Sequence, residues 1–238
     1  MPLVVVSPHL DDAVLGCGQL LAGHPGSAVI TVFAGRPGVP EPLREWDAAA
    51  GFRPGDDVIG ARRQEDRAAL ARLGARPVWL DFVDDQYGEP PDTEQLATAL
   101  EAAIMAERPS MVLMPLGLFH HDHALTHQAG VAVLRRQPSL AWFAYEDALY
   151  RAFPNVLAER LDGLRRDGVE SRRADIGSSA GVATKVAAIA CYASQLRALG
   201  TPGRPGHADA LAPERFWRLS RLAGAAVHNG ERSRVDAS

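Results

Sequence analysis

The chain has few cysteines and no long apolar segment. Cys17 and Cys191 are its two cysteines, and neither belongs to a CxxC pair. This usage argues against a disulfide framework and favours a reducing compartment. No apolar run approaches the roughly 20 residues that a membrane-spanning helix needs, and the N-terminus carries no signal-peptide pattern. We therefore expect a cytoplasmic protein with no membrane span.

Basic residues are not clustered, and Lys185 is the only lysine among the 25 basic residues. The net charge is −4, and arginine pairs such as Arg62-Arg63 are scattered as on solvated faces. We therefore expect no nucleic-acid partner. Hydrophobic residues make up 47% of the chain, which is enough to bury a substantial core. A chain of 238 residues suits one large α/β domain.

Strand-like apolar runs alternate with helical segments along the chain. This alternation predicts a single-domain, Rossmann-like α/β fold, in which a mostly parallel sheet is flanked by helices. The domain is expected over residues 1–228, and residues 229–238 read as a polar tail. We expect strands at 3–7, 28–33, 77–82, 111–115 and 140–145. We expect helices at 14–22, 59–73, 92–107, 124–135, 184–199 and 211–227, and a long loop at 36–55.

The first candidate strand ends in a histidine and two adjacent carboxylates. The run VVV at 4–6 leads into SPHLDD, which contains His9, Asp11 and Asp12. Open α/β sheets place their ligands at the carboxyl ends of strands. A histidine with a carboxylate suits a catalytic zinc, and the other carboxylate is left for proton chemistry. Taken alone, this motif is explained equally well by two aspartates that cap the following helix.

A second His/Asp cluster follows another candidate strand. The run MVLMP at 111–115 is followed closely by His120-His121-Asp122-His123, and His127 comes four residues later. Two such clusters at strand ends of one α/β domain are hard to explain by structure alone, so they indicate a metal site. His121 and His127 each fit an ordinary role as well, on a helix face or behind the ligands.

The two clusters supply the residues of a catalytic metal centre. A catalytic zinc usually takes three protein ligands and a water. We expect those ligands to be His9, Asp12 and His123, with Zn²⁺ as the metal, although this mixed donor set also suits other divalent ions. The remaining polar side chains are assigned to catalysis. Asp11 would be a general base, His120 would stabilise an oxyanion, and Asp122 would orient a histidine.

A nucleotide site and a serine nucleophile are both disfavoured. Gly16-Cys17-Gly18 is a near miss to the dinucleotide fingerprint, but the third glycine is absent and no acidic residue follows the second candidate strand. Asp11 and Asp12 would also repel a pyrophosphate. No G-x-S-x-G elbow occurs, and Cys17 is expected to be a small buried hydrophobe.

These motifs resemble those of the PIG-L/LmbE family of zinc-dependent N-acetylglucosaminyl deacetylases. The family's His-Pro-Asp-Asp-Glu stands here as HLDDA at 9–13, and its His-x-Asp-His as HHDH at 120–123. Residues 62–74 look like the family's Arg–Glu helix, and 80–84 like its acidic segment. Lys185 with Ser194-Gln195 looks like its late-helix signature. The family's Pro and Glu are Leu10 and Ala13 here, as in a Pro-His-Leu-Asp-Asp-Ala subgroup.

The resemblance implies the same ligands and base, and it adds substrate contacts. Arg62 and Asp84 match family positions that contact the substrate. From the residues themselves, Trp46 would either stack on a sugar face or anchor its loop over the core. Residues 145–147 are also expected in the pocket wall.

We therefore expect an enzyme that hydrolyses linear amide C–N bonds. It would remove an N-acyl group, expected to be N-acetyl, from a small amino sugar or amino-sugar conjugate by zinc-activated water. The family resemblance also implies self-association into a homo-oligomer. Two alternatives stay open: a metal hydrolase of a non-sugar amide or ester, and a non-catalytic, metal-containing binding protein. The surplus carboxylate of Asp11 argues against the second.

Overall fold

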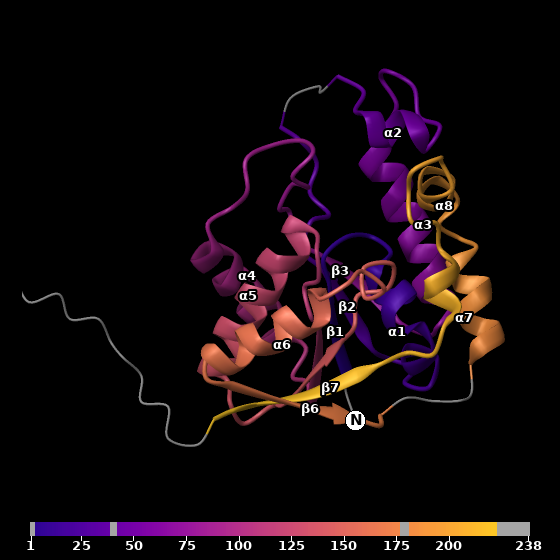
Figure 1. The fold of residues 1–238 in the computed structure, drawn as a ribbon. Coiled ribbons are helices and arrows are strands. Elements are labelled where there is room, and N and C mark those ends of the chain that lie inside the picture. The colour runs from indigo at the N-terminus through magenta and orange to yellow at the C-terminus, as the bar shows by residue number, and fades with distance from the viewer. Residues whose placement is uncertain (1–2, 39–41, 177–180, 223–238) are drawn as a thin grey trace, which may run out of the picture.

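A seven-stranded sheet with the order β3-β2-β1-β4-β5-β7-β6 forms the centre of the computed structural model (Figure 1). Residues 3–38, 42–176 and 181–222 are described. The first five strands are parallel, and β7 runs antiparallel to both β5 and β6. The strands are β1 (Leu3–Ser7), β2 (Ala28–Thr31), β3 (Arg76–Trp79), β4 (Met111–Pro115), β5 (Ala141–Tyr145), β6 (Val169–Ala174) and β7 (Phe216–Arg221).

Helices cover both faces of the sheet (Figure 1). One face carries α1 (Asp12–Ala22), α3 (Val58–Arg72), α7 (Val182–Ile189) and α8 (Ala193–Leu199). The other carries α4 (Thr93–Ala106), α5 (His121–Arg136) and α6 (Val156–Arg166). The short α2 (Glu45–Ala49) and a 3-10 helix (Ala208–Leu211) lie in connections. None of the helices in the described ranges is long and apolar enough to cross a membrane.

The apolar run of β1 is explained by burial on both sides. Val4 and Val6 belong to the core beneath α4 and α5, whereas Leu3 and Val5 belong to the core beneath α1 and α3. Successive side chains of a strand point to opposite faces, so a strand covered on both faces is apolar at every position. Because β1 lies between β2 and β4, its carboxyl end is in the interior of the sheet and not at an edge.

The strand order brings the two His/Asp clusters together. Because β1 pairs directly with β4, Leu3 lies opposite Met111. From β1 the chain passes through α1 to β2 on one side, and from β4 it passes through α5 to β5 on the other. Ligands of open α/β sheets bind at such a reversal of strand order, outside the carboxyl ends.

The predicted mixed α/β fold with a mostly parallel sheet is confirmed, and most of the corrections concern the second half of the chain. The helix expected at 211–227 is wrong, because Phe216–Arg221 forms β7 and pairs with β5 and β6. The helix expected at 184–199 is two helices, α7 and α8. The sequence analysis also missed α6, β6 and, within the expected loop, α2. The proposed tail at 229–238 lies outside the described residues.

The two glycines of the near-miss fingerprint are explained by packing of α1. A Cβ atom at Gly16 would lie 2.6 Å from the ring of Tyr145, and one at Gly18 would lie 2.8 Å from the side chain of Lys185. A glycine inside a helix costs about 1 kcal/mol relative to alanine, so its presence there needs a reason. Close approach of these two side chains supplies one without a nucleotide.

The single lysine forms a buried ion pair. The Nζ of Lys185 lies 2.8 Å from Oε1 of Glu214, and both side chains are at most 4% exposed. Glu214 also accepts hydrogen bonds from the backbone N–H groups of Gln19 and Leu20. Those groups follow Cys17, whose non-helical backbone interrupts the ladder of α1. The Glu214 carboxylate therefore supplies acceptors for backbone N–H groups at the interruption of α1, and Lys185 compensates the negative charge of Glu214.

Replacing Lys185 by methionine should destabilise the protein by about 3–5 kcal/mol, because Glu214 would keep a buried, uncompensated charge. Urea unfolding would measure the change. Arg172→Met is the matched control. Arg172 is paired with Glu170 on the surface, so its loss should cost less than about 1 kcal/mol. Equal effects of the two substitutions would contradict the assigned role of Lys185.

Candidate functional site

The turn after β1 is held by a serine and directs three polar side chains to one place. Ser7 Oγ donates to the carbonyl of His9 at 2.7 Å and accepts from the backbone N–H of Ala13 at 2.9 Å. Asp11 precedes α1 but makes no side-chain cap, and Asp12 Oδ2 accepts from the backbone N–H of His9 at 2.9 Å. The interpretation of the two aspartates as caps is therefore wrong for Asp11, whose carboxylate stays available.

The turn after β4 places the second cluster at the start of α5. Gly117 has a φ of 75°, and a Cβ there would lie 2.5 Å from Cβ of His127. Only glycine fits that turn. Asp122 and His123 are buried in the first turn of α5, whereas His121 is exposed. His127, one turn later, donates from Nδ1 to the carbonyl of Pro115 at 3.0 Å, so it is a structural histidine.

Two imidazoles converge on one oxygen of Asp12. Nδ1 of His9 and Nε2 of His123 each lie 3.2 Å from Oδ2 of Asp12. His9, Asp12 and His123 each offer one donor atom, and these donor atoms lie within 4.8 Å of one another, so the group could hold a metal ion. The structure thus brings together the three ligands predicted from the sequence.

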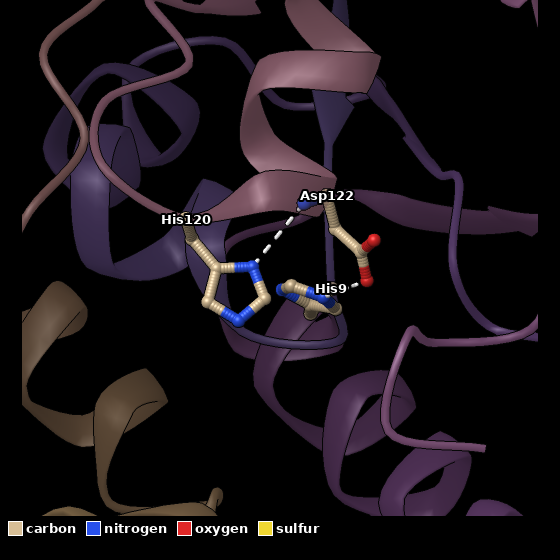
Figure 2. Close-up of side chains that lie close together, drawn as sticks. All are labelled: His9, His120 and Asp122. Carbon is tan, nitrogen blue, oxygen red and sulfur yellow. Dashed lines mark hydrogen bonds and ion pairs between the residues drawn. The ribbon is translucent and has the colours of Figure 1, made fainter. Parts of the chain in front are cut away.

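A buried carboxylate stands behind each imidazole. Nε2 of His9 lies 3.0 Å from Oδ2 of Asp122 (Figure 2), and Nδ1 of His123 lies 2.6 Å from Oδ1 of Asp147. The other oxygen of Asp147 accepts from the backbone N–H groups of Gly117 and Leu118. Carboxylates in this position fix the orientation and raise the basicity of histidine ligands. Asp122 is therefore placed where it could orient His9, which is the kind of role that the sequence analysis expects for it.

Residues 145–147 do not form the expected pocket wall. The hydroxyl of Tyr145 donates to the carbonyl of Val6 at 3.0 Å, deep in the core. Glu146 is fully buried and accepts from Arg173 and Trp217. Asp147 lies behind His123 instead of facing the cavity. The prediction is corrected because β5 is covered on both faces by packed elements.

The electrostatics of the cluster favour a bound cation. Burial lowers the pKa of His123, but Asp12 and Asp147 outweigh it and raise that pKa to about 9. The pKa of His9 is likewise raised well above its usual value, since Asp12, Asp122 and Asp84 outweigh burial. The rings of His9 and His123 are thus surrounded by more carboxylates than positively charged groups, so the site has an excess of negative charge. A site that attracts protons so strongly and offers nitrogen and oxygen donors fits a divalent metal ion.

The pKa values of Asp11 and His120 are shifted in opposite directions, which suits the two groups to different roles. Burial and the charge of Asp12 raise the pKa of Asp11 to about 7. Burial, His9 and His123 lower the pKa of His120 to about 4, which keeps its ring neutral. Nδ1 of His120 accepts a hydrogen bond from the backbone N–H of Asp122 at 3.3 Å (Figure 2). The proton of the neutral ring is therefore assigned to Nε2. A neutral imidazole with a free N–H can donate to an oxygen.

A cavity of about 230 Å³ opens over the cluster. Asp84 and Trp46, both predicted substrate contacts, line it. Asp84 lies 3.9 Å from Nε2 of His9, and the indole N–H of Trp46 donates to Gln195 at 3.1 Å. The sequence analysis missed six other lining residues: Asp85, Gln86, Leu149, Tyr150, Leu199 and Arg204. Gln195 had appeared only as part of a helix signature, and no local signal marked Arg204.

Arg62 does not line this cavity. Its guanidinium is 4% exposed and lies 2.8 Å from Asp47 of α2, with the hydroxyl of Tyr87 at 3.4 Å. The ion pair joins Arg62 to α2, the helix that also carries Trp46. Asp47 and Tyr87 line a second cavity of about 460 Å³ near residues 53–59. We place the site in the smaller cavity, since the titratable cluster lines it.

The fold and the cluster are those expected of a hydrolase with an α/β fold and a possible metal site, and comparison with known proteins agrees. The profile of the PIG-L family, GlcNAc-PI de-N-acetylase, matches residues 4–134. The 2'-N-acetylparomamine deacetylase of Streptomyces fradiae is 31% identical over 247 residues, which cover 94% of this chain and 84% of that protein. The chain belongs to the PIG-L family, and it is an N-deacetylase.

Solved structures of deacetylases share the whole fold. The A40926 pseudoaglycone deacetylase Dbv21 has a TM-score of 0.74 at 27% identity, covering 93% of this chain and 98% of that one. The zinc-inhibited form of teicoplanin deacetylase Orf2 has a TM-score of 0.77 at 22% identity, covering 94% of this chain and all of that one. These likenesses confirm the predicted architecture.

Proposed function

We propose that this enzyme removes an N-acetyl group from the amino sugar of a small, hydroxylated glycoside. One observation carries the proposal: two imidazoles converge on a carboxylate oxygen of Asp12, and beside them lies the carboxylate of Asp11, which makes no helix cap. The similarity to a deacetylase of 2'-N-acetylparomamine supports an amino-sugar substrate. The small polar cavity supports a substrate of one sugar ring at the reacting centre.

His9, Asp12 and His123 would hold the divalent cation, expected to be zinc. A second grouping of His9, His120 and Asp122 also offers suitable donors (Figure 2). We favour the first, because there each imidazole has an outer carboxylate behind it. A divalent cation bound there would acidify a water molecule and polarise the amide carbonyl.

The protein's own groups would then move the protons of amide hydrolysis. Asp11 takes a proton from the attacking water as the new C–O bond forms on the amide carbon. The Nε2–H of His120 donates to the developing oxyanion. The C–N bond then breaks, and the proton collected by Asp11 passes to the departing amine. The products are acetate and a free amino sugar.

Side chains around the cavity would select the substrate. Asp84 can accept hydrogen bonds from sugar hydroxyls, and the ring of Trp46 can cover a sugar face. Arg62 would contribute by fixing α2. A cytoplasmic location is supported by two free cysteines, and a homo-oligomeric state rests on the family resemblance.

The proposal is tested by metal analysis combined with acetate release. We expect about one divalent ion per chain in the wild-type protein and its loss in His123→Ala. Acetate release should occur from N-acetylated amino sugars such as 2'-N-acetylparomamine or N-acetylglucosamine, and not from an N-acetylated amino acid or an ester. His121→Ala, an exposed histidine of the same helix, should keep metal and activity.

Either of two results would overturn the proposal. If the wild-type protein takes up no divalent ion after reconstitution, the proposed metal centre is wrong. If it turns over only the non-sugar amide or the ester, the metal centre stands but the proposed substrate class is wrong.

A further inference from the structure

One large aromatic side chain is held outside the core beside the catalytic cluster. Phe119 is 68% exposed, and its φ of 62° lies in the left-handed region that non-glycine residues rarely adopt. It immediately precedes His120, so their Cα atoms are about 3.8 Å apart. Neither burial nor backbone preference accounts for a phenylalanine here, since glycine or asparagine would fit this backbone better.

Phe119 is the outer member of an aromatic ledge, which also contains Tyr150 and Phe153. Its ring stacks on Tyr150 with centroids 5.5 Å apart and meets Phe153 edge to face at 4.7 Å. Tyr150 and Phe153 contact each other at 6.1 Å. With Tyr150 behind it and Phe153 at its side, the ring of Phe119 is fixed while most of its surface faces solvent.

The ledge is continuous with the catalytic cavity. Tyr150 lines that cavity and lies edge to face with His123 at 5.1 Å, and it approaches the ring of His120 at 6.2 Å. An unbroken series of rings therefore leads from the metal-binding cluster to the solvent-facing side of Phe119. A molecule that reacts in the cavity and extends outward on this side must pass along it.

We propose that the aromatic ledge binds the second ring of the substrate, the ring joined to the N-acetylated amino sugar. This inference rests on the proposed function and names the substrate class further: a glycoside of at least two rings whose outer ring has an apolar face. A pyranose or cyclitol offers such a face through its C–H groups, and an aryl aglycone offers it directly. The fixed ring of Phe119 loses little conformational freedom on binding, which favours the bound state.

The experiment compares one-ring and two-ring ligands. Calorimetry would measure the dissociation constants of methyl N-acetylglucosaminide, N,N'-diacetylchitobiose and phenyl N-acetylglucosaminide, and acetate release would give kcat and KM for each. Phe119→Ala removes the ring and keeps the backbone strain, Phe119→Gly removes both, and Phe119→Trp keeps an aromatic face. Thermal unfolding of each variant reports any structural damage.

We expect both two-ring ligands to bind the wild type more tightly than the methyl glycoside. Phe119→Ala and Phe119→Gly should weaken them by about threefold to tenfold, the usual worth of an aromatic contact. The methyl glycoside should be unaffected, and Phe119→Trp should restore the difference. Because Ala and Gly differ in stability but share the missing ring, an equal loss of affinity excludes a folding effect. If only one two-ring ligand shows the effect, it identifies the outer ring as sugar or aryl.

The outcomes separate this inference from the proposed function. If binding depends on Phe119 but no acetate is released, the ledge binds the second ring as proposed, and the enzyme does not deacetylate these glycosides. If acetate is released but the dissociation constants depend neither on the second ring nor on Phe119, the proposed role of the ledge is wrong and the proposed function stands. A change of oligomeric state in Phe119→Ala, with ligand affinities unchanged, would show that the ledge is a subunit contact and would equally overturn the inference.

Discussion

Asp11→Asn should lower kcat on the order of 10²–10⁴-fold, the usual contribution of a general base. The amide of asparagine has nearly the same shape but cannot accept the proton of the attacking water. In the described residues no hydrogen bond to a backbone or side-chain partner ties up the Asp11 carboxylate, so the substitution breaks no supporting contact. Metal content should therefore stay at the wild-type value.

Two comparisons make the Asp11 result specific. Asp85→Asn removes another carboxylate that lines the same cavity and should change kcat less than tenfold, because Asp85 is not placed among the reacting groups. Asp12→Asn should lose the metal itself. Full activity in Asp11→Asn, or loss of metal from it, would remove Asp11 from the role of base.

Asp147→Ala should weaken metal binding by about 10–100-fold, although Asp147 is not itself a predicted ligand. Without its carboxylate, His123 loses the 2.6 Å contact that fixes Nδ1 and is free to rotate away from Asp12. Competition with a chelator of known affinity would measure the change. The backbone N–H groups of Gly117 and Leu118 also lose their acceptor, so stability should fall by about 1–3 kcal/mol per buried group.

Asp209→Ala separates the metal effect from the stability effect. Asp209 accepts from the backbone of Leu149 and pairs with Arg151, so it anchors the same connection after β5 without touching a histidine. Its loss should destabilise the protein and leave the metal affinity unchanged. Equal losses of metal affinity in both variants would mean that Asp147 acts only through general stability.

The metal-binding cluster was predictable because its chemistry is local in the sequence. Each half follows a strand that apolar composition reveals, and parallel strands deliver their carboxyl ends to one edge of the sheet. Asp147 and Glu214 were not predictable as partners of His123 and Lys185, since only tertiary packing brings them into contact. The same holds for β7, where Phe216 is buried in the core on one face of the sheet and Leu219 in the core on the other, because β7 pairs with β5 and β6.

Substrate contacts were the least predictable part of the site. Asp84 was placed correctly at the cavity by the segment after β3, whereas Arg62 turned out to pair with Asp47. An arginine suits a buried ion pair as well as it suits a substrate contact, so the sequence alone could not decide between these two roles for Arg62. Tyr150 and Arg204 reach the cavity from connections whose path depends on the packing of later helices.

Because its only lysine is buried, the folded protein should react unusually slowly with reagents that acylate lysine side chains. All other basic side chains are arginines, whose guanidinium groups do not react with common amine-directed esters. Lys185 is 2% exposed and bound to Glu214, so its amine should react slowly with such esters while the protein stays folded. Modification of Lys185, detected by mass spectrometry, would therefore report each opening of the contact between α7 and α1.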